Sequence, residues 1–395
     1  MNATRVVLIA RRFWPLTGGA ERATANLARG LLDQGARPSI VTARADTHWP
    51  GEVCWREMPV HRLPFPQRFG WGMMRYMIGL SRWLRKNRSA IDLVCVSRLA
   101  HEAHAALGAL AGSGIPVVLR AEASELPDEV TWTRHSGPPG RVRRRWLAAD
   151  AVVATGSQAH ERVLAAGFDP RRVHRIPNGV AITLERDPAA RAAARRALAE
   201  ANEEMRVPRN MPVAVCLGQL TPDHAFDRVV RAWSDVAREW PFARLWLIGE
   251  GEEREHLYRQ IRRADLVGRV LLPGPFDEVD DLLQAADLMI LPAAAGNEPL
   301  ALLEAVAAGL PVVASRSPGH TEWVVPGVTG RLFPLEDERG LAAAVVDAFR
   351  DQDAGNRMAA SARQRLRHQR GIRETATAHL ALFEQLLGSA TRSTS

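Results

Sequence analysis

One glutamate stands alone in an apolar segment, and its residue type and surroundings carry a clear chemical implication. The stretch Pro299–Ala308 has helical character and a single polar side chain, Glu304. Leu300, Leu303 and Ala307 share the face of Glu304 in the spacing of a core stripe. A helix that is apolar on every side belongs in a protein interior, where an unpaired carboxylate costs several kcal/mol. We therefore expect a ligand hydroxyl group, an arginine or a cleft to meet Glu304.

Two glycine-containing turns could bring backbone N–H groups close to a ligand. Gly18-Gly19 precedes a helical pattern after the first apolar run, and Gly249-Glu250-Gly251 follows a later apolar run. Glycine lets a ligand approach the backbone, and the start of a helix favours anions. A phosphate cradle and a plain tight turn are both consistent with Gly18-Gly19, because the pattern Gly-x-Gly-x-x-Gly is absent.

A third group of polar residues follows the predicted strand Pro116–Ala121. Arg120, Glu122 and Glu125 lie at its carboxyl end, and ligands of open α/β sheets bind outside such ends. Arg120 and Glu122 are therefore positional candidates for catalysis. The alternative is a salt bridge between them that caps the strand.

The elements that must position these residues alternate between strands and helices, a pattern typical of parallel sheets in α/β folds. Near-continuous apolar strands indicate sheets covered on both faces. The predicted strands are Val6–Ala10, Pro38–Thr42, Ile91–Ser97, Pro116–Ala121, Ala151–Thr155, Val173–Pro177, Pro212–Gly218, Ala243–Gly249, Arg269–Pro273, Asp287–Pro292 and Pro311–Ser315.

A chain of 395 residues is longer than those that usually fold around a single hydrophobic core, which indicates two domains. An alanine, arginine and glutamate helix, Asp187–Glu204, separates the two sets of strands, and the region Glu336–Gly388 is predicted to be helical throughout. The predicted parts are a first domain at 1–185, a linker helix at 186–208, a second domain at 209–370, a helix at 371–390 that returns to the first domain, and a disordered tail at 391–395.

The motifs, in this order, resemble those of family 4 glycosyltransferases of the GT-B fold. The resemblance rests on Pro-x-x-Gly-Gly-x-Glu-Arg from Pro15, the turn Ile176–Val180, the helix with Glu304, and Glu322. It implies two doubly wound Rossmann-like α/β domains that face a cleft and close around a ligand, with a C-terminal helix that crosses back to the first domain. It also implies that Glu304 holds the ribose of a sugar nucleotide.

Several positions depart from that family pattern. In register, Gln219 stands where the family has an arginine and His224 where it has a lysine, the two cations that grip the donor diphosphate. Ala225 replaces a glycine, and Gly296 replaces a glutamate that contacts the donor sugar. Hydrogen bonds to charged groups are worth about 1.5–3 kcal/mol each, so the loss of two cations weakens donor binding by a factor of roughly 10² to 10⁴.

Other residues could compensate for part of this loss. Gln219 still donates hydrogen bonds, and His224 would make donor affinity depend on pH. Arg228 is the nearest alternative cation along the chain, and Glu298 lies two residues from the missing carboxylate. The implied donor-binding residues are Gly18, Gly19, Gln219, His224, Gly249, Glu298, Pro299, Leu300 and Glu304.

Charge, cysteine content and hydrophobic runs indicate which partners the protein could bind and in which cell compartment it is expected. The net charge of +8 invites an anionic partner, but no nucleic-acid-binding motif accompanies it. Three widely spaced cysteines form neither a metal pattern nor a disulfide framework, and no signal peptide or membrane-spanning run is present, which predicts a cytoplasmic protein. The stretch Arg68–Lys86 and the basic run Arg141–Trp146 suggest peripheral contact with the inner face of a membrane, although such a helix more often packs against its sheet.

The sequence therefore predicts a hexosyltransferase that uses a sugar nucleotide and a polysaccharide or lipid-linked acceptor. By resemblance the reaction retains anomeric configuration and needs neither a metal nor a cofactor besides the co-substrate. The alternative is a catalytically degraded GT-B protein that acts as a binding or regulatory partner, because Gln219, His224 and Gly296 depart together. A third interpretation is another cleft enzyme of this fold, such as a sugar-nucleotide epimerase or a phosphorylase.

Overall fold

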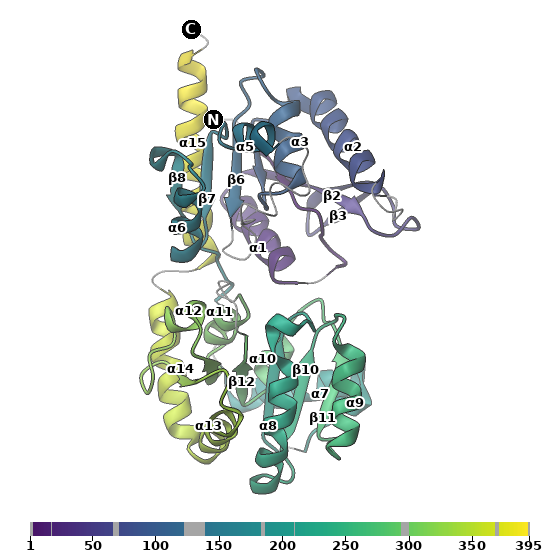
Figure 1. Cartoon of the computed structure of the whole chain (residues 1–395), viewed down its shortest axis with the longest axis vertical. Helices are drawn as coiled ribbons and strands as arrows, with labels where there is room; N and C mark the ends of the chain where they lie inside the picture. The colour runs from purple at the N-terminus through teal and green to yellow at the C-terminus, as the bar shows by residue number, and fades with distance from the viewer. Residues whose placement is uncertain are drawn as a thin grey trace. The chain divides into compact units, whose positions relative to one another are not determined.

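The structure is a computed structural model that describes residues 3–16, 18–65, 71–121, 139–182, 186–208, 210–293, 300–367 and 371–393. The chain divides into two compact α/β units (Figure 1). The first unit consists of Met1–Leu16, Ala20–Gly179 and Ile372–Ser395, and the second of Val180–Gly371 together with Thr17–Gly19.

Within the described residues, the first unit has an eight-stranded sheet in the order β3-β4-β2-β1-β5-β6-β7-β8. Its strands are parallel except for β3, which pairs antiparallel with β4. The strands are β1 (Arg5–Ile9), β2 (Arg37–Arg44), β3 (Glu52–Trp55), β4 (Met58–Pro64), β5 (Leu93–Val96), β6 (Val117–Ala121), β7 (Ala151–Ala154) and β8 (Val173–Arg175). The helices are α1 (Gly19–Asp33), α2 (Trp71–Asn87), α3 (His101–Ala109), α5 (Pro139–Trp146), α6 (Ser157–Ala165) and α15 (Ile372–Ser393).

The second unit has a six-stranded parallel sheet in the order β11-β10-β9-β12-β13-β14, again counted over the described ranges. Its strands are β9 (Val213–Leu217), β10 (Arg244–Ile248), β11 (Val270–Gly274), β12 (Leu288–Leu291), β13 (Val312–Ser315) and β14 (Arg331–Phe333). Its helices are α7 (Pro188–Ala201), α8 (Phe226–Glu239), α9 (Arg254–Arg263), α10 (Asp280–Ala285), α11 (Leu300–Ala307), α12 (Pro318–Thr321), α13 (Glu338–Arg350) and α14 (Gln352–Arg367).

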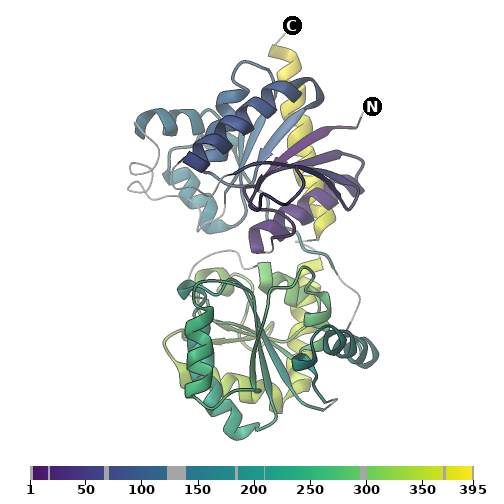
Figure 2. The same cartoon turned by 90° about the vertical axis from the view of Figure 1, so that its right-hand side faces the viewer.

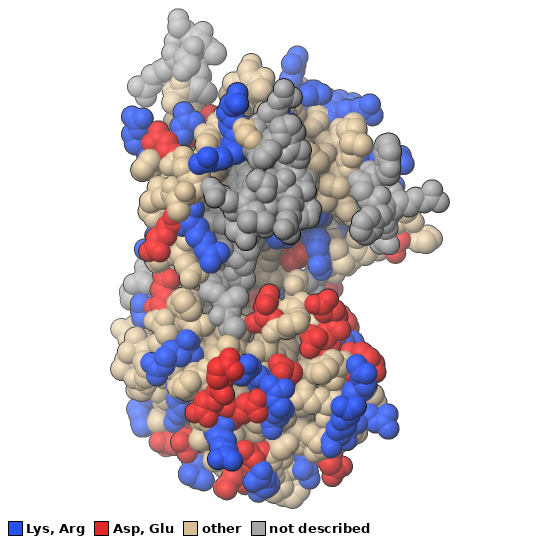
Figure 3. Space-filling view, in the orientation of Figure 1, with Lys and Arg blue, Asp and Glu red and all other residues tan. Residues whose placement is uncertain are grey.

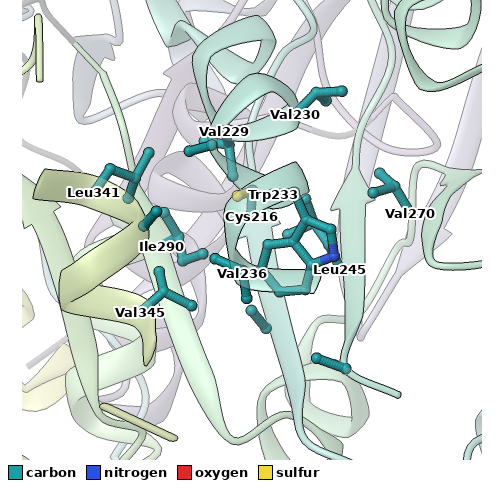
Figure 4. Close-up of a cluster of buried hydrophobic side chains, with 14 of the residues drawn as sticks. Cys216, Val229, Val230, Trp233, Val236, Leu245, Val270, Ile290, Leu341 and Val345 are labelled. Atoms are coloured by element: carbon teal, nitrogen blue, oxygen red, sulfur yellow. The ribbon is translucent and has the colours of Figure 1, made fainter. Parts of the chain in front are cut away.

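Each sheet is covered by helices on both faces, as its apolar strands require (Figure 2). In the second unit, the fully buried Trp233 of α8 packs with Cys216, Leu245 and other side chains of the strands below it (Figure 4). Val345 of α13 extends the same cluster. Cys216 is fully buried in this core, and the burial raises the pKa of its thiol.

The doubly wound α/β prediction is confirmed, and the predicted strands are present with ends shifted by one or two residues. The edge strands β3 and β14, and β4 next to β3, were not predicted. Strand β3 is half exposed and β14 has three residues, so neither produces a buried apolar run. Residues 391–393 belong to α15, where we had expected a disordered tail.

The C-terminal helix crosses back to the first unit, as the family pattern implied. Phe383 of α15 is fully buried in one core cluster with residues of β1 and α1. Helix α1 makes room for it at Gly30, because a Cβ atom there would lie 2.6 Å from the Ile372 side chain.

The helix expected to be a linker is instead part of the second unit. Helix α7 packs against α10, and its buried Arg195 forms a 3.0 Å ion pair with Asp287, just before β12. The division between the units falls after Gly179 rather than at 185.

Candidate functional site

The second sheet has a topological switch point between β9 and β12. Strand β9 pairs with β10 on one side and with β12 on the other, so the connections that leave β9 and β12 run in opposite directions. In parallel α/β sheets, ligands bind outside the carboxyl ends of the strands at such a point. The turn after β9 contains Gln219 and His224, and helix α11, which contains Glu304, follows β12.

The turn between β9 and α8 is closely tied to the turn after β10. The backbone N–H of Leu220 donates to the Glu250 carbonyl group over 2.9 Å, and that of Glu253 donates to Leu220 over 2.9 Å. A Cβ atom at Gly249 would lie 1.8 Å from the Gly218 carbonyl oxygen, and one at Gly251 would lie 2.2 Å from that of Leu220. These glycines are therefore required by the close approach of two turns, a reason that the sequence did not reveal.

His224 is held in place within the turn. Its Nδ1 lies 3.0 Å from the Thr221 hydroxyl group, and its ring lies so close to Gly218 that a Cβ atom there would be 2.6 Å from Cδ2. Burial lowers the pKa of His224, opposed by the negative charge of Asp223. The imidazole is therefore neutral at pH 7, and it does not carry the positive charge of the lysine in the family pattern.

The residues near His224 in the sequence differ in their side-chain contacts and backbone conformation. Gln219 is exposed and makes no side-chain hydrogen bond within the described part of the chain. Ala225 adopts a left-handed conformation with φ 51°, the backbone geometry that explains a glycine in the family pattern. Arg228, the alternative cation, forms a 2.7 Å ion pair with Glu336.

Glu304 lies on the short apolar helix that the sequence predicted. Helix α11 spans Leu300–Ala307, and Leu300, Leu303 and Ala307 are at most 5% exposed. Glu304 itself is half-buried, so part of its surface meets solvent. Gly296, Glu298 and Pro299 lie outside the described residues, as does Glu122 of the first unit.

A buried histidine on α12 was missed by the sequence analysis. His320 is 2% exposed, and its Nδ1 lies 3.1 Å from the Ser315 carbonyl oxygen at the end of β13. The Ser315 hydroxyl group donates to Ala293 just after β12, over 2.5 Å. Burial lowers the pKa of His320 to about 4, so it stays neutral while it ties the ends of two strands together.

In the first unit, Arg120 is buried rather than directed at solvent. It is 3% exposed and donates to the Asn178 side chain. The neighbouring Pro177 carbonyl group accepts from Thr375 of α15 over 3.1 Å, and Gly179 accepts from Asn26 of α1 over 3.0 Å. Arg120, Asn26 and Thr375 thus all bond to the turn 177–179.

The glycine that begins α1 has no close neighbour at its Cβ position among the described residues. Gly19 is the first residue of α1, and a Cβ atom there would meet nothing within 4 Å among the described residues. Unlike Gly249, this glycine is therefore not required by a neighbouring backbone.

Charge is distributed unevenly between the two units. The first unit has 28 Arg and Lys and 16 Asp and Glu residues, and the second has 24 and 28. The net charges are therefore +12 and −4, and on the face shown in Figure 3 groups of acidic side chains lie among basic ones on the second unit. The positive charge that suggested an anionic partner thus belongs to the first unit.

Two features concern metals and membranes. Among the described residues, no three His, Cys, Asp or Glu side chains gather in a way that could hold a metal ion. None of the helices in the described ranges is long and apolar enough to cross a bilayer.

Comparison with known proteins identifies relatives of both units. Residues 17–184 match the family described as Glycosyltransferase Family 4, and residues 211–351 match Glycosyl transferases group 1. The chain is 31% identical over 166 residues to the lipopolysaccharide core biosynthesis glycosyltransferase LpsE of Rhizobium meliloti, covering 42% of this chain and 47% of LpsE. Over 244 residues it is 31% identical to a GDP-mannose-dependent phosphatidylinositol monomannoside mannosyltransferase of Mycolicibacterium smegmatis, covering 59% and 61% of the two chains.

The chain thus spans about half the length of the curated relatives it matches. Among solved structures, Anabaena HepE in complex with UDP and glucose superposes with a TM-score of 0.77 at 19% identity, covering 97% of this chain and 100% of HepE.

Proposed function

Because the chain belongs to glycosyltransferase family 4, of the GT-B fold, we propose that it transfers a hexose from a sugar nucleotide to a polysaccharide or lipid-linked acceptor. The observation that carries this proposal is the switch point of the second sheet. There the turn with Gln219 and His224 follows β9, and the helix with the half-buried Glu304 follows β12, the two strand ends outside which sheets of this kind bind ligands. The name of LpsE refers to lipopolysaccharide core biosynthesis, which supports a glycan acceptor. HepE was solved in complex with UDP and glucose, which supports a sugar nucleotide as the donor.

In this proposal each residue has a defined role. Glu304 accepts hydrogen bonds from the ribose hydroxyl groups, and Gln219 and His224 donate to the diphosphate. Arg316, which follows β13 at the same edge, is exposed and has no ion pair in the described ranges, so it can add positive charge. The protein contributes orientation and electrostatic stabilisation, with retention of configuration and without a metal ion.

The alternative is a GT-B protein that binds a partner without catalysis. It is supported by the neutral state of His224 and by the ion pair that keeps Arg228 on Glu336. Both observations leave the diphosphate position less positive than the family pattern requires.

Titration calorimetry separates these two candidates. UDP, GDP, UDP-glucose and GDP-mannose are titrated into the whole chain up to about 5 mM, the weak end of specific affinity. Binding of a sugar nucleotide, followed by its hydrolysis or transfer in the presence of EDTA, supports the proposed enzyme. If none of the four binds, the result favours the partner-binding alternative.

A charge-restoring variant then tests the role of the altered site. The triple change Gln219→Arg, His224→Lys and Gly296→Glu restores the family residues, and Gln364→Arg on exposed α14 is the control for added charge. If the triple variant tightens donor binding by roughly 10²-fold and the control does not, the diphosphate position is as proposed. Unchanged affinity in both variants contradicts it.

We further propose that the first unit makes peripheral contact with an anionic membrane. Helix α2 packs as predicted, with Tyr76, Leu80 and Leu84 fully buried. Its outer face, however, exposes Met74 and Ile78, with exposed arginines along the same helix. An outer face of this composition suits an anionic lipid surface.

A further inference from the structure

An exposed tryptophan stands at the switch point of the first sheet. Strand β1 pairs with β2 on one side and with β5 on the other, so the loop after β1 lies at the kind of position where open α/β sheets bind ligands. Trp14 is in this loop, close in sequence to Gly18 and Gly19, and 37% of its surface is exposed. An exposed indole at such a position is available to a ligand.

A buried arginine fixes the position of this tryptophan. The guanidinium carbon of Arg62, on β4, lies 5.5 Å from the ring centroid of Trp14 and 5.3 Å from that of Trp49. Its Nη2 also donates to the Trp14 carbonyl group over 2.9 Å. Arg62 therefore holds both the backbone and one face of the Trp14 ring.

Besides its contacts with Trp14 and Trp49, the Arg62 side chain donates a long hydrogen bond of 3.4 Å to the Pro50 carbonyl group. It is 4% exposed, burial lowers its pKa, and no carboxylate pairs with it within the described residues. A buried cation without a carboxylate is costly, and stacking between two aromatic rings offsets part of this cost. The burial of this side chain is explained if its contribution is to keep the partly exposed Trp14 ring rigid.

We propose that Trp14 is the stacking platform for a pyranose ring of the acceptor glycan. This inference rests on the proposed function, because it assigns the acceptor side of that reaction to the first unit. The C–H face of a pyranose ring is apolar and flat enough to cover an indole ring, whose burial is favourable. A ring held by Arg62 loses little conformational freedom on binding, which increases the affinity for a sugar.

The test uses direct glycan binding with UDP present at saturation. Maltotetraose, cellotetraose and isomaltotetraose are titrated into the whole chain and followed by saturation-transfer NMR. Trp14→Leu removes the ring but keeps an apolar side chain, Trp14→Phe keeps a smaller ring, and Phe242→Ala removes an aromatic residue of the second unit that is 67% exposed. UDP affinity is measured for every variant.

We expect at least one oligosaccharide to bind, and Trp14→Leu to weaken that binding by about tenfold or more. Trp14→Phe should stay within about threefold of wild type, and Phe242→Ala should be unchanged. UDP affinity should be the same in all four proteins, and unchanged melting transitions of both units show that each one folds.

Two results would contradict the assignment of Trp14 as a stacking platform. One is oligosaccharide binding by Trp14→Leu as tight as that of wild type, and the other is a wild type that binds UDP but none of the oligosaccharides. A wild type that binds no nucleotide contradicts the proposed function instead, so the two failures are distinguishable. If Trp14→Leu loses UDP affinity as well, Trp14 is a structural or nucleotide-binding residue and the assignment is wrong.

Discussion

His224 occupies the position at which the family pattern has a lysine, and its surroundings determine its protonation. The ring packs on Gly218 and against the Thr221 hydroxyl group, and burial lowers its pKa. A bound diphosphate favours the protonated form, so its binding would raise the pKa of His224. At a pH between the pKa of His224 in the free protein and its raised pKa in the complex, donor binding takes up a proton. Donor affinity therefore increases as the pH falls through this range.

We therefore expect UDP-glucose to bind about tenfold more tightly at pH 5 than at pH 7.5. UDP-glucose is the suitable probe because its diphosphate diester keeps its charge over this range. The affinity of His224→Asn should be independent of pH, and His320, with a pKa of about 4, stays neutral over most of the window. Calorimetry at four pH values measures this, and a flat profile for wild type contradicts the contact.

At the scale of elements, helix α15 completes the core of a unit whose other elements end at Gly179. Phe383 is fully buried and packs with β1 and α1 residues, and the buried His379 lies one turn earlier in the same helix. Burial, and the nearby charge of Arg120, lower the pKa of His379 to about 3, so it stays neutral and remains part of the core.

Phe383→Ala should therefore destabilise the first unit by about 3–5 kcal/mol, the usual cost of such a cavity. Differential scanning calorimetry should show one transition at lower temperature, while the transition of the second unit is unchanged. Glu384→Ala, at the exposed neighbouring position, is the control and should change stability by less than about 0.5 kcal/mol. If the transition temperature of the first unit is the same in both variants and in wild type, α15 contributes little to that core.

At the scale of the whole molecule, the net charge of +8 is the sum of a basic and an acidic unit. An anionic membrane should therefore attract the first unit, with the exposed Met74 and Ile78 of α2 entering the interface. The attraction is electrostatic and should weaken as salt screens it.

Vesicles with about one third phosphatidylglycerol should co-sediment the chain at about 50 mM salt and release most of it at about 300 mM. The double variant Met74→Ser and Ile78→Ser should bind about tenfold more weakly, because two apolar side chains no longer enter the lipid. Val325→Ser with Val328→Ser, exposed positions in the acidic second unit, is the matched control. Equal loss in both double variants would exclude α2 as the contact.

The sequence by itself determined the elements whose physics is local. Apolar runs predicted the buried parallel strands, helical spacing predicted α11 around Glu304, and the order of the motifs indicated the family. The half-exposed β3 and the three-residue β14 were not predicted, because their stability comes from neighbouring strands rather than from their own composition.

Only the tertiary structure decided which neighbours each side chain meets, because those neighbours come from distant parts of the chain. It placed Arg120 in a buried contact with Asn178, and Gly249 against the backbone of Gly218. It also brought Arg62 beneath the exposed Trp14, a pair separated by 48 residues. Spacing along the sequence carries no information about such contacts, since the order of strands in the sheet creates them.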